Sequence, residues 1–430
     1  MNEHVHVPAL VVGGGIGGLA TALSLARAGQ PVHLVERAAE FAEIGAGLQF
    51  GPNASRALDA LGVLDDILPL AVRPPRAVMM DALTGEPLTT LDLGSSFTDR
   101  YGYPYLVLHR HDLLDMLVEH CRRHPLITLE NRRDVTDVEL HSDVALVRCA
   151  DGTVYRTPAL VGADGLNSTL RRKVVDDELV CSGYAAYRGT VPSHQAGHAI
   201  APNDVVLWIG PGMHLMQYPV RRGELYNQVA VFRSPRFAAG HTAPGDWGGP
   251  EELDAAFAAG ARPVRDAVAK IGRTRRWSMF DRAPARTWIN GPLVLTGDAA
   301  HPMLQYLGQG ACQALEDAVE LGHRFQQHTA GGAVDVARAY REFEQARLPR
   351  ATRCQTSARP WGELWHTDSP LLLALRDRVL TQRAADDYRE LDWLYSPAPS
   401  GTAAPALSIQ PSQSPMRAPA PAGASTLPRP

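Results

Sequence analysis

The chain has 430 residues, 45% of them hydrophobic, and a formal net charge of −4. This length is ample for more than one compact domain. The near balance of charges argues against a nucleic-acid-binding protein, which would need a basic surface. No stretch reaches the roughly 18 apolar residues of a membrane span.

The cysteines are scattered and odd in number, and they form no CxxC pair. This pattern argues against a disulfide framework and against a metal site. With no recognisable signal peptide, it leads us to expect a cytoplasmic protein without a bound metal. The five positions are Cys121, Cys149, Cys181, Cys312 and Cys354.

The first elements in chain order predict a βαβ unit. An apolar strand at 9–12 meets a run of glycines, a helical pattern with one apolar face follows, and a second strand occupies 32–36. Such a unit is the building block of nucleotide-binding α/β domains.

The rest of the chain changes character twice. Residues 184–232 alternate between apolar and polar positions, which indicates a separate sheet inserted into the nucleotide-binding domain. After a short apolar strand at 293–296, helices dominate from 313 to about 395. The other expected elements are helices at 52–61, 111–123 and 251–271, strands at 75–93 and 160–163, and a hairpin region at 135–155.

Residues 13–18 read Gly-Gly-Gly-Ile-Gly-Gly and fit the GxGxxG pattern between the first strand and the first helix. Gly13 permits a tight turn, Gly15 lets the backbone approach a pyrophosphate, and Gly18 lets the helix pack close to the strand. Glu36 ends the second strand about 20 residues later, where a carboxylate accepts hydrogen bonds from ribose hydroxyls. The pattern predicts a dinucleotide site.

Two further motifs place an acid at the end of an apolar strand. Asp164 lies in Gly-Ala-Asp-Gly-Leu-Asn-Ser, and Asp298 lies in Gly-Asp-Ala-Ala-His-Pro, which leads to Gly310 and Ala311. Acids at strand ends suit ribitol hydroxyls, and a helix N-terminus suits a phosphate or the edge of a flavin. Taken singly, each motif is also compatible with an ordinary strand-to-helix turn.

The three motifs in this order resemble the class A flavoprotein monooxygenases, the p-hydroxybenzoate and salicylate hydroxylase group. The resemblance covers roughly residues 8–395 and implies FAD as cofactor. It implies that Arg110 contacts the phosphate and ribityl region, Asp298 the ribityl chain, and Asp164 both FAD and NAD(P)H. The residues that match the ADP-binding end are Gly13, Gly15, Gly18, Glu36 and Arg37.

The resemblance implies an α/β fold in which a Rossmann-like FAD-binding domain carries an interposed mixed β-sheet substrate domain and C-terminal helices. We expect the FAD-binding domain at 1–74, 100–180 and 272–330, and the substrate domain at 75–99 and 181–271. A C-terminal helical segment at 331–395 precedes a tail, 396–430, whose Pro, Ala and Ser content predicts disorder.

Several stretches, among them 182–190 and 361–366, are similar to one branch of this family, the 3-hydroxybenzoate 6-hydroxylases. This resemblance implies para hydroxylation of 3-hydroxybenzoate to 2,5-dihydroxybenzoate (gentisate) through a flavin C4a-hydroperoxide. The co-substrates are O2 and NADH or NADPH, with NADH favoured. Gln305 stands where related salicylate hydroxylases carry proline, and its amide offers a donor and an acceptor to the substrate.

His214 is the candidate general base, because an imidazole suits proton transfer near neutral pH. It shares one strand face with Met216 and Tyr218, which we expect to line the substrate pocket. Spacing alone favours core packing for His214 and Tyr218, and only the resemblance reverses this. Tyr105 is equally compatible with the pocket and with packing, and Arg188 with binding a carboxylate and with a solvated strand edge.

His301, Trp361 and Trp365 are expected to have structural roles. The resemblance implies a homodimer that acts on a small aromatic acid. Three alternatives remain: a decarboxylating salicylate 1-hydroxylase, a hydroxylase of another phenolic metabolite, and a non-catalytic flavin-binding protein. The intact motif at 297–311 argues against the last of these.

Overall fold

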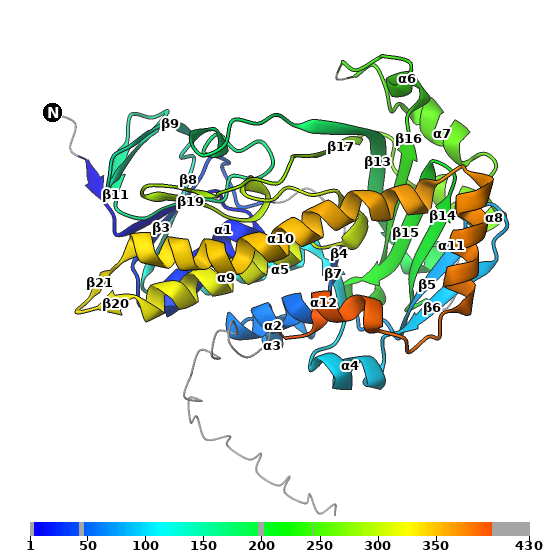
Figure 1. The fold of residues 1–430 in the computed structure, drawn as a ribbon, viewed down its shortest axis with the longest axis horizontal. Helices are drawn as coiled ribbons and strands as arrows, with labels where there is room; N and C mark the ends of the chain where they lie inside the picture. Colours follow the sequence, from blue (N-terminus) through cyan, green and yellow to red (C-terminus); the bar gives the residue numbers. More distant parts are fainter. Residues whose placement is uncertain (1–3, 43–46, 197–201, 244, 398–430) are drawn as a thin grey trace, which may run out of the picture.

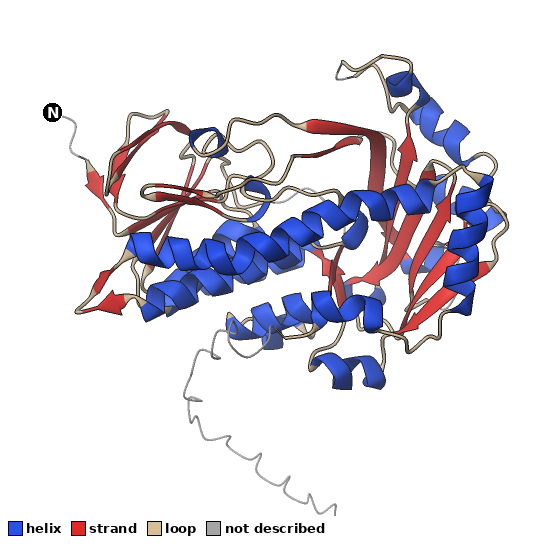
Figure 2. Ribbon diagram, viewed as in Figure 1, coloured by secondary structure: helices blue, strands red, loops and turns tan. Residues whose placement is uncertain are grey.

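The computed structural model describes residues 4–42, 47–196, 202–243 and 245–397. All but the first two residues of the predicted tail, 396–430, lie outside the described residues. Two large β-sheets, joined by long helices, make up most of the described chain (Figure 1, Figure 2).

The first sheet has six strands, all parallel except at one edge, in the order β18-β19-β12-β2-β3-β8. It contains the predicted βαβ unit, formed by β2 (Ala9–Val12), α1 (Ile16–Arg27) and β3 (Val32–Glu36). Every residue of β2 is buried, as expected for a central parallel strand. The remaining strands are β8 (Ile127–Asn131), β12 (Leu160–Gly162), β18 (Ile289–Asn290) and β19 (Leu293–Leu295).

This strand order brings the three motifs together. β19, β12 and β2 are adjacent and parallel, so their carboxyl ends meet at one edge of the sheet. Each motif directly follows one of these strands, and ligands of α/β sheets bind outside the carboxyl ends. Three segments that lie far apart in the sequence therefore converge on one place.

Three smaller sheets accompany this core. A four-stranded sheet has the order β1-β11-β10-β9, and β4 pairs with β7. The first of these contains the predicted hairpin region. The strands are β1 (Val5–His6), β4 (Gly47–Phe50), β7 (Leu106–His109), β9 (Val135–Leu140), β10 (Ala145–Cys149) and β11 (Val154–Thr157), with a short hairpin of β20 (Thr329–Ala330) and β21 (Ala333–Val334).

The second large sheet has seven strands in the order β17-β13-β16-β15-β14-β5-β6. It is mixed, because β14 and β5 run parallel while the other neighbours are antiparallel. This arrangement confirms the predicted fold class. The strands are β5 (Arg76–Asp81), β6 (Pro87–Asp92), β13 (Val180–Pro192), β14 (Val205–Gly210), β15 (Met213–Val220), β16 (Leu225–Arg233) and β17 (Trp277–Asp281).

One boundary differs from the sequence-based division. β17 falls in the range 272–330, which we assigned to the FAD-binding domain, yet it pairs with β13 at the edge of the seven-stranded sheet. The reason is that β16 pairs with one edge of β13 and leaves the other edge to β17. The sheet therefore extends past residue 272 to Asp281.

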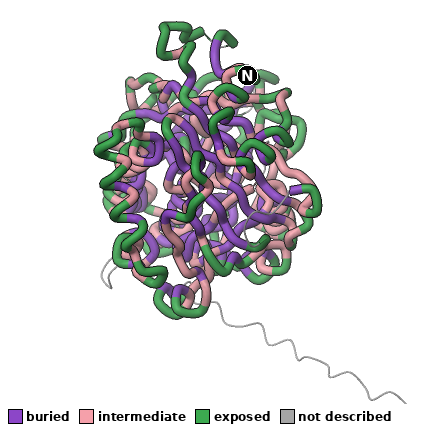
Figure 3. The backbone as a smooth tube through the Cα atoms, turned by 90° about the vertical axis from the view of Figure 1, so that its right-hand side faces the viewer, coloured by how far each residue is buried: buried purple, intermediate pink, exposed green. Residues whose placement is uncertain are grey.

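The helix α10 (Val336–His366) links the two large sheets. It begins beside α9 (Gly310–Gln327) in the first core and ends against β14 and β15 of the seven-stranded sheet (Figure 1). Buried residues concentrate in the interior of the molecule and exposed residues at its periphery (Figure 3). The other helices are α2 (Pro52–Ala60), α3 (Leu64–Ile67), α4 (Ser95–Tyr101), α5 (Arg110–Arg123), α6 (Pro235–Ala238), α7 (Pro250–Phe257), α8 (Arg262–Val268), α11 (Pro370–Gln382) and α12 (Asp392–Tyr395).

Within the part of the chain that the structure describes, no helix is both long and apolar enough to cross a membrane. The same residues hold no cluster of three His, Cys, Asp or Glu side chains with the geometry of a metal site. All five cysteines are free thiols.

Candidate active site

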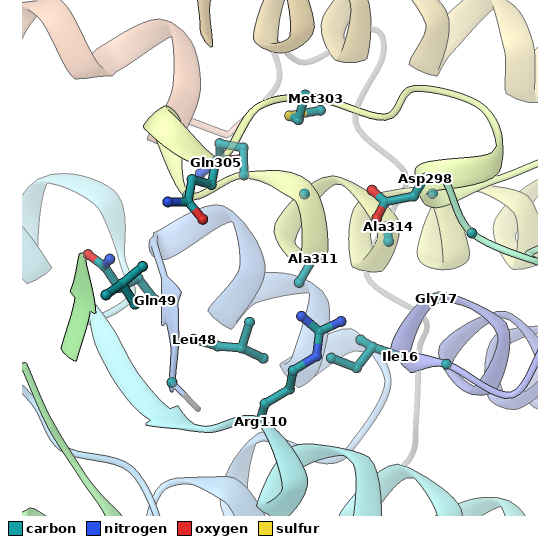
Figure 4. Close-up of a pocket in the computed structure, with 18 of the residues that line it drawn as sticks. Ile16, Gly17, Leu48, Gln49, Arg110, Asp298, Met303, Gln305, Ala311 and Ala314 are labelled. Carbon is teal, nitrogen blue, oxygen red and sulfur yellow. The ribbon is translucent and has the colours of Figure 1, made fainter. Parts of the chain in front are cut away.

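A cavity of about 350 Å³ lies where the motif edge of the first sheet faces the seven-stranded sheet (Figure 4). Its walls bring together most of the site residues predicted from the sequence. From the first sheet and its helices come Gly15, Arg110, Asp298, Gln305, Gly310 and Ala311, and from the seven-stranded sheet come His214, Met216 and Tyr218.

The glycine turn before α1 has no room for side chains. Gly13 has φ +114°, and a Cβ there would overlap the carbonyl of Ala163; a Cβ on Gly18 would overlap the carbonyl of Gly13. Gly15 caps α1 without a side-chain hydrogen bond to the first helical N–H groups. These N–H groups and the positive end of the helix dipole therefore remain available to a phosphate beside the cavity.

Two predicted cofactor acids make bonds within the protein. The carboxylate of Glu36 accepts the N–H of Gly14 at 2.6 Å and that of Ala38 at 2.8 Å. Asp164 accepts the hydroxyl of Ser168 at 2.5 Å and thereby shapes the turn that follows β12. Glu36, Asp164, Gly13 and Gly18 do not line the cavity, and neither does Arg37, which is exposed at the end of β3.

Arg110 and Asp298 supply opposite charges to the cavity (Figure 4). Arg110 begins α5, and burial lowers the pKa of its guanidinium while the nearby Asp298 carboxylate raises it. Asp298 is exposed to the cavity in the turn after β19. Gly310 and Ala311 lie in the first turn of α9, whose N-terminus also lacks a side-chain cap.

A buried ionic network supports the turn that carries Asp298. The carboxylate of Asp317 on α9 accepts the N–H of Gly297 at 2.9 Å, contacts Nε2 of His301 at 2.6 Å and pairs with Arg347 at 2.8 Å. Burial alone would raise the pKa of Asp317, but the charges of His301 and Arg347 and these hydrogen bonds lower it to about 2. His301 therefore has the structural surroundings that the sequence led us to expect.

Strand register explains why the residues of the opposite wall face the cavity together. Met216 pairs with Val229, which pairs with Arg188, so these three form one row across β15, β16 and β13 on one face of the sheet. His214 and Tyr218 lie two residues before and after Met216 and point to the same side. All five line the cavity.

His214 is enclosed, with 2% of its surface exposed. Its Nδ1 lies 2.7 Å from Nε2 of His366, and its ring meets the rings of Tyr306 and Trp365 edge-on. Burial lowers the pKa of His214 to about 3. The imidazole is therefore neutral at physiological pH, with one ring nitrogen protonated and the other free to accept a hydrogen bond.

Gln305 and Gln49 both line the cavity and lie at the same end of it (Figure 4). Within the described residues, the side-chain amide of Gln305 has no protein hydrogen-bond partner, whereas Gln49 accepts the hydroxyl of Tyr105 at 2.9 Å. Tyr105 does not itself line the cavity. It lies behind Gln49 and fixes the orientation of that amide.

Sequence reasoning missed or undervalued three side chains. Trp365, expected as core, is buried and also lines the cavity. The sequence assigned no role to His366, which ends the family-like stretch 361–366. Arg188 is no solvated edge residue: it lies over the ring of Trp277 at 4.6 Å, and its Nε is buried without a hydrogen-bond partner in the described residues. Burial and the nearby charge of Arg110 lower its pKa to about 10.

These features fit the phosphates and the ribityl chain of a flavin dinucleotide. Two uncapped helix N-termini, a buried arginine and a strand-end carboxylate surround one cavity, which matches the needs of phosphates and ribitol hydroxyls. Gly13 and Gly18 accept no Cβ, because the carbonyl groups of Ala163 and Gly13 occupy that space, so the turn packs tightly against the segment that follows β12.

Comparisons with known proteins agree. Residues 6–358 match the family described as FAD binding domain. The chain is 38% identical over 392 residues to 3-hydroxybenzoate 6-hydroxylase of Klebsiella oxytoca, an alignment that covers 90% of this chain and 96% of that protein. It is 34% identical over 409 residues to salicylate hydroxylase of Pseudomonas putida, covering 90% and 91%.

Among solved structures, a variant of HpxO from Klebsiella pneumoniae complexed with FAD matches with a TM-score of 0.77 and 26% identity, covering 92% of this chain and 100% of that one. The chain therefore belongs to the FAD binding domain family and, within it, to the class A flavoprotein hydroxylases. This finding confirms the resemblance drawn from the three motifs.

Proposed function

We propose that the protein is an FAD-dependent, NADH-consuming monooxygenase that converts 3-hydroxybenzoate to 2,5-dihydroxybenzoate. The observation that carries this proposal is one cavity with a neutral buried imidazole, His214, on one wall and the unpartnered amide of Gln305 on the other. The relatives named 3-hydroxybenzoate 6-hydroxylase support the choice of substrate.

FAD, when bound, activates O2 for transfer of one oxygen atom to the aromatic ring. Gly15, Arg110, Asp298, Gly310 and Ala311 are the lining residues that would hold it. The N-termini of α1 and α9 and Arg110 suit its phosphates, and Asp298 suits its ribityl hydroxyls. Glu36 and Asp164 would contribute mainly by fixing the shape of the turns, because their carboxylates are already engaged.

His214 accepts the proton of the substrate hydroxyl, which makes the ring electron-rich at the para position. Gln305 holds a polar group of the substrate through its free amide, and Met216 and Tyr218 form the floor beneath the ring. Tyr105 acts indirectly, by orienting Gln49. The enclosed aromatic wall of Trp365 and Tyr306 excludes water from this side.

Arg188 binds the substrate carboxylate in this arrangement. It is a half-buried cation on the same sheet face as His214, and no carboxylate of the described residues pairs with it. Two strand spacings and a two-residue offset separate the Cα atoms of His214 and Arg188 by about 12 Å. A hydroxybenzoate can bridge the imidazole and the long guanidinium side chain over this separation.

We propose that NADH is the reductant. It would bind without a domain of its own, because residues 13–18 are the one GxGxxG pattern in the sequence. We further propose a homodimer in the cytoplasm.

The deciding experiment measures NADH and NADPH oxidation with each monohydroxybenzoate and identifies the products. Gentisate without CO2 release is expected; catechol with CO2 from salicylate would replace this proposal with the salicylate 1-hydroxylase, and failure to take up FAD would leave a non-catalytic protein.

A further inference from the structure

The end of α10 places a second imidazole against the candidate base. Nε2 of His366 lies 2.7 Å from Nδ1 of His214, and the two ring planes are 14° apart with centroids 5.0 Å apart. This centroid distance is the N–N distance lengthened by one ring radius at each end. The contact is therefore an in-plane hydrogen bond and not a stack of ring faces.

His366 is held in place from several sides. Its carbonyl accepts the N–H of Gly212, just before β15, at 2.9 Å. The ring of Tyr184 on β13 stacks on its face with centroids 4.6 Å apart, and Tyr306 meets it edge-on. Only 3% of its surface is exposed. The imidazole therefore keeps its orientation toward His214.

Two neutral imidazoles share a single proton in such a contact, so one ring must donate and the other must accept. We propose that His366 is a positioning residue whose Nε2 accepts a hydrogen bond from the Nδ1–H of His214. This hydrogen bond keeps Nε2 of His214 unprotonated and facing the cavity. The inference rests on the proposed hydroxylase function. It adds a partner from α10 to a base that lies on β15.

In the reaction the proton moves from the phenol to His214. The O–H bond of the phenol breaks, its proton binds Nε2 of His214, and the electron pair stays on the phenolate oxygen. The positive charge that forms on His214 is shared through the Nδ1 hydrogen bond with His366. The reverse arrangement, with His366 donating, would leave Nε2 of His214 protonated and unable to act as a base.

Both imidazoles are neutral before the proton transfer. Burial lowers the pKa of His214 to about 3, and burial, His214 and Arg233 lower that of His366. Arg233 is itself paired with Asp368 at 2.9 Å, outside the imidazole pair. No described carboxylate contacts either ring, so His366 is the group that stabilises a charged His214.

The tautomer of His214 is directly measurable. Nitrogen-15 NMR of the histidine-labelled, FAD-loaded protein, with the His214 signal identified by its loss in His214→Gln, reports which ring nitrogen carries the proton. We expect Nδ1–H in the wild type and a shift toward Nε2–H in His366→Leu. An Nε2–H tautomer in the wild type overturns the proposal whatever the substrate is. The expected tautomer with no hydroxylation of 3-hydroxybenzoate leaves this inference standing and rejects the proposed function.

A double-mutant cycle separates positioning from folding. His366→Leu should reduce the rate of hydroxylation at least about tenfold, and His366→Gln, whose amide oxygen can accept the Nδ1 proton, should recover part of it. In the His214→Ala background the same His366→Leu change should cause no further loss. An equal loss in both backgrounds overturns the proposal.

His323→Leu is the matched control for this cycle, because His323 is a buried imidazole on α9, 5% exposed, that does not line the cavity. We expect wild-type rates from it. FAD content and the melting temperature of all variants show whether the fold is intact, and His366→Gln keeps the test open if His366→Leu does not fold.

Discussion

Oδ2 of Asp317 lies 2.6 Å from Nε2 of His301, and the same oxygen accepts the N–H of Gly297, so one buried carboxylate fixes the turn that presents Asp298. The Asp317→Asn change removes this charge and leaves Arg347 buried with one fewer anion. Loss of one partner from a buried pair typically costs about 3–5 kcal/mol. We therefore expect a strongly lowered free energy of unfolding, measured by urea titration.

The low pKa of Asp317 makes the stability of the folded protein fall at acid pH. The folded pKa of Asp317, about 2, lies below the ordinary value for aspartate. Its stabilising effect is therefore complete above about pH 4 and is lost as the pH falls toward 2. Glu139→Gln, which disrupts an exposed pair with Arg148, serves as control and should change stability little. Equal stability of Asp317→Asn and wild type would contradict the supporting role.

Asp298→Ala should weaken FAD retention. A hydrogen bond to a charged group contributes about 1.5–3 kcal/mol, which corresponds to roughly 10- to 100-fold in the dissociation constant. Equilibrium dialysis followed by flavin absorbance measures it. Asp143→Ala, in the turn between β9 and β10 and away from the cavity, should bind FAD as the wild type does. Unchanged affinity of Asp298→Ala would remove the ribityl assignment.

The sequence sufficed for features that local patterns encode. GxGxxG and the two strand-end acids each follow a short apolar strand, and parallel neighbours bring such ends together. The shared face of His214, Met216 and Tyr218 follows from the two-residue period of a strand. The periodicity and the motifs are local to each strand, whereas the pocket role of His214 and Tyr218 depended on the family resemblance.

Contacts between distant segments could not be read in this way. His366 lies 152 residues from His214, and their meeting depends on where α10 crosses the seven-stranded sheet. The partners of Glu36 depend on how the glycine turn packs against β3. For Tyr105 the sequence left the pocket and plain packing equally open, because nothing in it shows the hydrogen bond of this residue to Gln49.

Arg188→Met should raise KM for 3-hydroxybenzoate by about 10- to 100-fold, because a charge-assisted hydrogen bond to the carboxylate is lost. Arg188→Lys keeps the charge but loses the planar set of N–H donors, so its KM should lie between those of the wild type and Arg188→Met. The substrate supplies the control: 3-hydroxybenzyl alcohol lacks a carboxylate, so its KM should be the same in all three proteins. A parallel rise for the alcohol would show that Arg188 shapes the cavity and does not bind the acid.

His214→Ala should slow hydroxylation by about 10²- to 10⁴-fold, the usual contribution of a general base. FAD should remain bound, because His214 lies on the wall opposite the helix N-termini, and the electrons of NADH should appear as H2O2. Oxygen consumption and product yield per NADH measure this uncoupling. Met216→Leu, on the same face of β15, should stay coupled. Full coupled turnover by His214→Ala would reject the base assignment.

The buried imidazole also makes stability depend on pH. The folded pKa of His214 is about 3, against an ordinary value near 6.5, so between these values the unfolded chain binds a proton that the folded protein does not. The contribution of this pKa difference to the free energy of unfolding is fully present above about pH 6.5. It is lost as the pH falls below this value, by up to about 1.4 kcal/mol per pH unit. From pH 7.5 to 5, His214→Gln should therefore lose about 2 kcal/mol less than the wild type in unfolding free energy. Urea titrations at both pH values measure the difference, and Met216→Leu, which adds no titrating group, should follow the wild type. Parallel losses in His214→Gln and wild type would mean that the imidazole takes up its proton over the same pH range in the folded and the unfolded protein, so that burial does not lower its pKa.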